Sequence, residues 1–138
     1  KAEAHNLGIT LDIKGLLWLQ GESDSFGQEA PPAYESKLKS FISGLRTDLN
    51  KPALPVHIGQ IPDSDIWEER EQIWAAQAAV ADSDDNAFLV KSKSLELLTD
   101  DSYGGDQVHW STRGNVALGE LFADSVILAD SISQATAR

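Results

Sequence analysis

The chain contains no cysteine, few basic residues and no long apolar run. The absence of cysteine excludes disulfides, thiolate zinc sites and a cysteine nucleophile, although it leaves the redox compartment open. The 138 residues carry 11 Lys and Arg against 22 Asp and Glu, a formal net charge of −11. Nucleic acids and anionic membrane surfaces both require clustered Lys and Arg, so this balance argues against either as a partner. No stretch approaches the roughly 18 consecutive apolar residues of a membrane span.

The length and the first residues limit what the chain can be. It is long enough for one domain with a real core, and we expect residues 1–138 to form a single domain. The opening segment KAEAHNLG has no Met and reads like the end of a helix. We therefore expect that Lys1 is not the natural start, and the localisation stays unknown.

Three short apolar runs predict strands that are buried on both faces. They are rich in Leu, Ile and Val, and they do not alternate with polar residues. The runs are Leu16 to Leu19, Val56 to Ile61 and Phe88 to Val90. Pro55 and Pro62 flank the second run without interrupting it, as a strand requires.

Helical patterns lie between and after these runs. From Pro32 to Leu49 apolar residues recur at steps of three and four, which predicts an amphipathic helix. A second helix is predicted from Asp65, with that residue as N-cap and acids in its first turn. A third is predicted after Ser111. Alternating strands and helices indicate an α/β fold with a parallel sheet and helices on both of its faces.

Polar residues follow the first predicted strand at once. In GLLWLQGESD the apolar run ends in Gln20, Gly21 and Glu22. Ligands of open α/β sheets bind beyond the carboxyl ends of the strands, so these residues are candidates for a functional site. An ordinary polar loop would show the same pattern, and the position alone does not decide between the two.

A second constellation stands near the other end, in GGDQVHWSTRGN. Asp106 precedes His109 by three residues, a spacing that allows the carboxylate to orient the imidazole and leave its other nitrogen free as a base. A surface histidine that caps a loop is the alternative. The other histidines are less promising, because His5 lies in the irregular start and His57 lies inside an apolar run, where a buried structural role is expected.

Taken together, these segments resemble the SGNH-type carbohydrate esterases, in the sialate O-acetylesterase and acetyl xylan esterase branch. GLLWLQGESD is similar to the third conserved block of that family, and DQVHWSTRG is similar to its last block. LPVHIGQI and REQIWAAQ fall between them in the expected order, so the resemblance extends from about Gly15 to Ala123. It implies a flavodoxin-like three-layer α/β fold and a serine esterase that removes acetyl groups from carbohydrate hydroxyls without a cofactor.

The resemblance also implies roles for individual residues. His109 would be the general base, and Asp106 or Glu22 would be the acid that orients it. Gln20 would offer its side-chain amide to the oxyanion, with Gly21 allowing close approach, because a neutral amide stabilises the developing charge without neutralising the base. Trp110, next to the histidine, is a candidate to line the acyl or sugar pocket.

One part of the family pattern is missing. The nucleophile of this family sits in a Gly-x-Ser-Asn element at the end of the first strand, and the sequence contains no such element. Ser23 belongs to the third block and is read as a turn residue. We therefore expect an incomplete esterase domain that is inactive alone. The strand at Leu16 to Leu19 would be the third of the fold, and its open edge would be covered by the N-terminal part of the domain or by a second chain.

Two other functions are compatible with parts of the pattern. The chain could be a carbohydrate-binding or interaction domain that kept the fold and lost the nucleophile. A cation site is the other alternative, and its ligands would be Glu22, Asp24, Asp100, Asp101 and Asp106. These carboxylates lack the fixed spacing of a calcium loop, so no metal is expected. The esterase reading accounts for Gln20, Glu22, Asp106 and His109 together, and we favour it.

Overall fold

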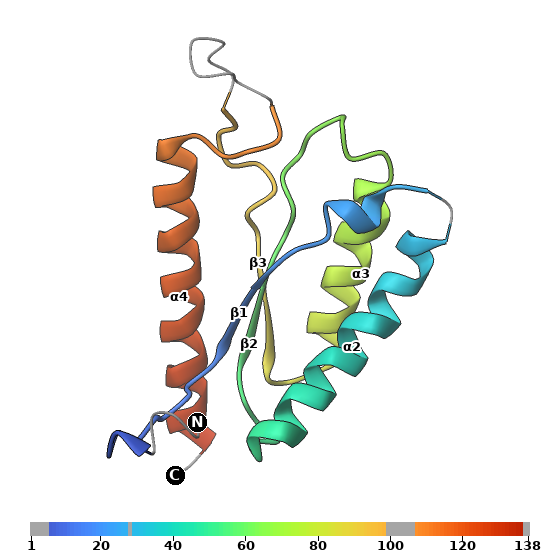
Figure 1. The fold of residues 1–138 in the computed structure, drawn as a ribbon. Helices are drawn as coiled ribbons and strands as arrows, with labels where there is room; N and C mark the ends of the chain where they lie inside the picture. Colours follow the sequence, from blue (N-terminus) through green and yellow to red (C-terminus); the bar gives the residue numbers. More distant parts are fainter. Residues whose placement is uncertain (1–5, 28, 99–106, 137–138) are drawn as a thin grey trace.

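The computed structural model describes residues 6–27, 29–98 and 107–136. Its elements alternate along the chain as the apolar pattern predicts, in a sheet flanked by helices (Figure 1). In order they are β1 (Leu16–Leu19), the 3-10 turn η1 (Ser23–Ser25), α2 (Ala30–Leu49), β2 (Val56–Gly59), α3 (Arg70–Asp82), β3 (Ala87–Val90) and α4 (Thr112–Thr136). Among the described helices, none is long and apolar enough to cross a membrane.

The sheet is parallel, with the order β1-β2-β3. At the start of β2, Val56 pairs with Leu16 of β1 on one side and with Ala87 of β3 on the other. Helices α2 and α3 cover one face and α4 covers the other (Figure 1). All four residues of the central strand β2 are buried, which explains why its sequence is a continuous run rather than an alternating one. The predicted α/β class with helices on both faces is confirmed.

Two element boundaries differ from the prediction. The second strand is predicted to extend to Ile61, but β2 ends at Gly59. Ile61 is nevertheless fully buried and extends the core beyond the strand. The prediction that the next helix begins at Asp65 with that residue as N-cap is wrong, because α3 begins at Arg70 and Glu69 occupies the cap position. The Glu69 N–H donates to the carbonyl of Ser25, a contact between distant segments that local sequence does not show.

The core lies mainly between the sheet and the α2–α3 face. Its buried members include Tyr34, Leu38 and Ile42 on one stripe of α2, packed with β2 and α3 residues such as Ile58 and Ile73. Burying each aliphatic side chain of this size stabilises the fold by roughly 1.5–3 kcal/mol. A smaller cluster on the other face joins β3 to α4 through Val90, Leu118 and Phe122.

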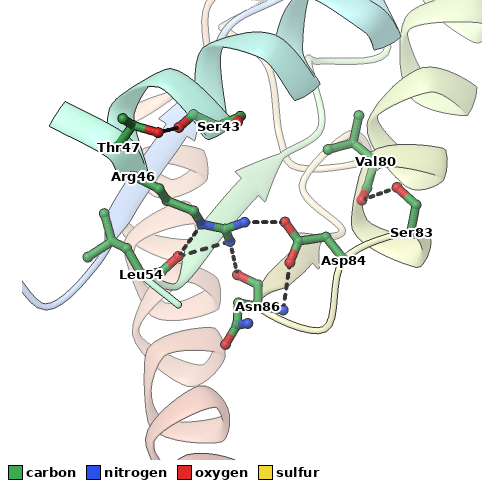
Figure 2. Close-up of polar contacts among 8 residues, drawn as sticks. All are labelled: Ser43, Arg46, Thr47, Leu54, Val80, Ser83, Asp84 and Asn86. Carbon is green, nitrogen blue, oxygen red and sulfur yellow. Dashed lines mark hydrogen bonds and ion pairs between the residues drawn. The ribbon is translucent and has the colours of Figure 1, made fainter. Parts of the chain in front are cut away.

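A partly buried arginine holds the edge of the sheet where the strands begin (Figure 2). The Arg46 guanidinium donates to the Leu54 carbonyl at 3.1 and 3.0 Å, to the Asn86 carbonyl at 3.2 Å and to the Asp84 carboxylate at 2.5 Å. Partial burial acts to raise the pKa of Asp84, but hydrogen bonds from Arg46 and from the Asn86 backbone outweigh it and keep that pKa below its ordinary value. The end of α2 is thereby tied to the loops before β2 and β3.

Strand β1 forms an open edge. In the described part of the chain it pairs with β2 on one side and has no strand on the other. Leu17 is 56% exposed and Leu19 is 36% exposed, although both lie in an apolar strand. An exposed apolar strand edge is a template for pairing with another segment.

Candidate active site

The carboxyl ends of the three parallel strands reach the same edge of the sheet (Figure 1). Gln20 and η1 follow β1 there, and the segment from Gln107 to Ser111 lies at this edge before α4 begins. That segment is anchored to the chain after β3, because the Leu98 N–H donates to the His109 carbonyl at 2.7 Å and Ser111 N–H donates to the Glu96 carbonyl at 3.0 Å. Gln20, Glu22 and His109 therefore share one edge, although 87 positions separate the last two.

The two segments approach this edge from opposite faces of the sheet. Turn η1 packs beside α2 and α3, whereas the segment with His109 leads into α4 (Figure 1). His109 is exposed, and its main chain is fixed by Leu98. Asp106 lies outside the described residues, so the structure gives no geometry for its pairing with His109.

Gln20 is held firmly at the end of β1. Its carbonyl accepts a hydrogen bond from the Tyr34 hydroxyl at 2.7 Å and another from the Gln77 side-chain amide at 3.2 Å. Burial raises the pKa of the Tyr34 hydroxyl, which favours the protonated form that donates here. The Gln20 side-chain amide donates to the Asp24 carboxylate at 2.5 Å. An amide nitrogen carries two hydrogens, so this contact orients the group and uses one of them.

Gly21 is required by the packing beneath the site. Its φ of +144° is rarely adopted by residues with a side chain, and an added Cβ would lie 2.7 Å from Ile73 Cγ2 and 3.1 Å from Ile61 Cγ2. Glu22 follows half-buried, and its carbonyl accepts hydrogen bonds from the Ser25 backbone and hydroxyl. Ser23 belongs to η1, as the reading of it as a turn residue predicts.

Trp110 is half-buried and packs against the cluster of Val90, Leu118 and Phe122. It forms an isolated antiparallel bridge with Leu97. Its indole Nε1 is buried and has no acceptor among the described residues, and the same holds for Trp67. Such orphan donors are rare in protein interiors, and both stand near the edge that carries the candidate site.

Comparisons with known proteins identify the family of the chain. A family model for carbohydrate esterases, described as sialic acid-specific acetylesterase, matches residues 1–128. The chain belongs to this carbohydrate esterase family. A protein of Arabidopsis thaliana named as a probable carbohydrate esterase is 30% identical over 116 residues, which are 84% of this chain and 41% of that protein. The crystal structure of an Arabidopsis thaliana protein matches with a TM-score of 0.76 and 28% identity, over 91% of this chain and 48% of that one.

The solved structure is of that same Arabidopsis thaliana protein, and this member of the family thus spans less than half of its length. The fold implied by the resemblance is confirmed as far as the described residues extend, with its parallel sheet between helical layers. The roles of the individual side chains stay predictions. Within the described ranges, no group of three or more His, Asp or Glu side chains could hold a metal ion.

The sequence analysis did not predict one polar cluster of this chain. Arg70 donates from Nε to Asp63 at 2.8 Å and from Nη2 to Asp65 at 2.7 Å. The three residues line a cavity of about 420 Å³ at the same edge as His109. The prediction of Asp65 as a helix cap left this pairing out. Two acids spaced two residues apart and followed by an arginine are the sequence signal that could have predicted it.

Proposed function

We propose that this chain supplies the base, the orienting acid and one oxyanion donor of a serine-type carbohydrate O-acetylesterase. The observation that supports it best is the fixed position of Gln20 at the edge of the sheet that also carries His109. Family membership supports the ester chemistry, and the acetylated carbohydrate is the proposed substrate class. No cofactor is needed for this reaction.

In the proposed reaction His109 accepts the proton of a serine hydroxyl as its oxygen attacks the acetyl carbonyl. The negative charge that develops on the carbonyl oxygen is stabilised by the Gln20 amide, whose hydrogen not used by Asp24 is available to donate. When the tetrahedral intermediate collapses, His109 gives its proton to the departing sugar oxygen. Water then repeats the sequence on the acetyl-enzyme, and acetate leaves.

The acid that orients His109 is Asp106 or Glu22. Asp106 is three residues from the histidine in sequence, and its carboxylate would hold one imidazole nitrogen. Glu22 is half-buried on the turn that follows β1 and is the second candidate. Trp110 is proposed to border the pocket with the exposed part of its ring.

The attacking serine is proposed to come from outside this chain. Gly-x-Ser-Asn is absent from the sequence, and two buried serines donate their hydroxyls to backbone carbonyls. Ser25 Oγ donates to the Glu22 carbonyl at 2.7 Å, and Ser92 Oγ donates to the Gln60 carbonyl at 2.7 Å. Both side chains are buried, which keeps them from a substrate. The isolated chain is therefore proposed to be inactive.

The open edge of β1 supports a partner that completes the domain. Beside it lies a cavity of about 530 Å³ lined almost wholly by apolar groups, including Leu17, Leu118, Phe122 and Ile127. Leu17 and Ile127 are 56% and 63% exposed. The proposed occupant is the N-terminal part of the esterase domain, on the same chain or a second one, because this chain covers only 41% of its curated relative and 48% of the matching solved structure. A parallel strand added here would end beside Gln20.

The test compares the isolated chain with a version extended by the Gly-x-Ser-Asn segment. Only the extended form should hydrolyse para-nitrophenyl acetate, and His109→Ala should lower its kcat by roughly a thousandfold or more, because the triad acts as a unit. Gln20→Ala should cost about a hundredfold in kcat, with exposed Gln72→Ala as the matched control. An extended form that binds acetylated sugar without turnover would instead support a carbohydrate-binding domain.

A further inference from the structure

The buried side chain of Gln77 ties together the carboxyl ends of β1 and β2. Gln77 lies two turns into α3 and is 0% exposed. Its Nε2 donates to the Gln20 carbonyl at 3.2 Å and to the Gly59 carbonyl at 3.1 Å. Gln20 follows β1 directly, and Gly59 is the last residue of β2. An amide nitrogen carries two hydrogens, so each of the two strand ends receives one of them.

The packing around this amide leaves the end of β2 little freedom. Turning the Gln77 amide over would place its oxygen against two carbonyl oxygens and remove a donor from each, so one orientation is strongly favoured. On Gly59 an added Cβ would lie 2.7 Å from a Leu19 methyl and 2.9 Å from the Phe122 ring of α4. Close packing and the hydrogen bond from α3 therefore both hold the end of β2 in place.

The same link continues from β2 to the segment that carries His109. Ser92, which follows β3, is fully buried and donates from its Oγ to the Gln60 carbonyl at 2.7 Å. The chain after Ser92 then fixes the histidine segment, because the Leu98 N–H donates to the His109 carbonyl at 2.7 Å. Hydrogen bonds and main chain thus run without a break from the proposed oxyanion donor Gln20, across the ends of the strands, to the proposed base.

We propose that Gln77 is a positioning residue of the esterase, which sets the separation between Gln20 and His109 by joining the ends of β1 and β2. The inference rests on the proposed function and adds to it a buried residue that touches no substrate. Tyr34 holds the Gln20 carbonyl from α2, whereas Gln77 also reaches β2. Oxyanion stabilisation requires a donor about 2.7–3.1 Å from the developing charge. A displacement of about 1 Å at such a site lowers the rate by roughly a hundredfold.

The decisive experiment measures kcat and KM of the extended chain with para-nitrophenyl acetate. Gln77→Met keeps the length of the side chain but removes both donors, and kcat should fall by about tenfold or more while KM changes by less than about twofold. Val80→Ala is the matched control, because Val80 is 1% exposed in the same helix but lines a cavity with Arg46 where the strands begin. This control should lower the urea midpoint and leave kcat unchanged. Wild-type kcat in Gln77→Met, or an equal loss in Val80→Ala, would overturn the proposal.

An NMR measurement tests the positioning role without relying on the nucleophile. In the isolated chain, Gln77→Met should shift the side-chain amide signals of Gln20 and lower their order parameter, whereas Val80→Ala should leave both unchanged. If Gln77→Met does not fold, Ser92→Ala takes its place in both experiments, because it removes one hydroxyl from the same link. An inactive extended wild type would count against the esterase function alone. Unmoved Gln20 signals in the variant would contradict the role of Gln77.

Discussion

The hydroxyl of Tyr34 donates to the carbonyl of Gln20 at 2.7 Å, joining the first turns of α2 to the end of β1. The same hydroxyl lies 3.3 Å from the Trp18 indole nitrogen, which donates to it. One buried side chain thus fixes the strand and the residue that leaves it toward the proposed site. The position of Gln20 is set by the core rather than by its own loop.

Removing the Tyr34 hydroxyl should disturb the position of Gln20, and with it kcat, while lowering the stability of the fold only moderately. Tyr34→Phe leaves the carbonyl with Gln77 alone and should lower the free energy of unfolding by about 1–2 kcal/mol, measured by urea denaturation. In the extended chain kcat should fall while KM changes little, since the oxyanion donor acts in the transition state. Ser36→Ala removes an exposed hydroxyl bond of the same helix and should do neither. An unchanged kcat would contradict this positioning role.

Two glycines give a matched test of backbone strain. Gly21→Ala should lower the free energy of unfolding by about 2–4 kcal/mol, because its φ is +144° and the new Cβ would press on buried Ile73. Gly44→Ala lies within α2 with nothing near its Cβ position, and should stabilise the chain by up to about 1 kcal/mol. Thermal or urea unfolding of both variants measures the contrast. Similar effects in the two would rule out the steric explanation.

The orienting acid can be identified by comparing two isosteric variants of the extended chain. Asp106→Asn or Glu22→Gln should lower kcat by roughly a thousandfold or more, and the larger loss marks the partner of His109. Asp24→Asn tests the amide of Gln20 separately and should have a smaller effect, since a neutral acceptor remains at that position. Wild-type kcat in both isosteric variants would refute a triad built on His109.

The open edge of β1 predicts different behaviour in the isolated and completed domains. Leu17→Asp should barely change the stability of the isolated chain, because this side chain is 56% exposed there. In the extended chain the same variant should lose activity and stability, since the covered site would bury an unpaired charge. Leu7→Asp, at a side chain 71% exposed, is the control. Amide exchange at Leu16 to Leu19 should slow markedly on extension, and strong protection in the isolated monomer would contradict the proposal.

His57 makes stability depend on pH. It is buried, its Nδ1 lies 2.7 Å from Ser125 Oγ, and its ring stacks on Phe88. Burial lowers the pKa of His57 below 6.5, against a smaller opposite effect of Asp130. The unfolded chain therefore binds the proton first, and stability present above about pH 6.5 is lost as the pH falls toward the folded pKa. Urea midpoints from about pH 7.5 to 5 should show this fall, and His57→Gln should flatten it.

The candidate site was only partly predictable from the sequence. Gln20 and Glu22 are predicted at the carboxyl edge because they follow an apolar run at once, and His109 is expected there from the family resemblance. The packing demand on Gly21 could not be foreseen, since Ile61 and Ile73 approach it from segments far along the chain. Nor could the Arg70 cluster, whose side chains meet only in the folded turn.

The sequence by itself determined the strands, the helices and the parallel α/β class. Apolar periodicity is a local property, and a continuous run such as Val56 to Ile61 indicates burial without knowledge of the neighbours, whereas in Leu16 to Leu19 the same pattern overstates it. Only the tertiary structure decided where α3 begins. There the Glu69 N–H donates to the Ser25 carbonyl, and the Arg70 side chain donates to Asp63 and Asp65. It also decided that the acids paired with Arg70 lie beside Gln107, two residues from His109. Those features depend on contacts between distant segments, and such contacts produce no periodic pattern in the amino-acid sequence.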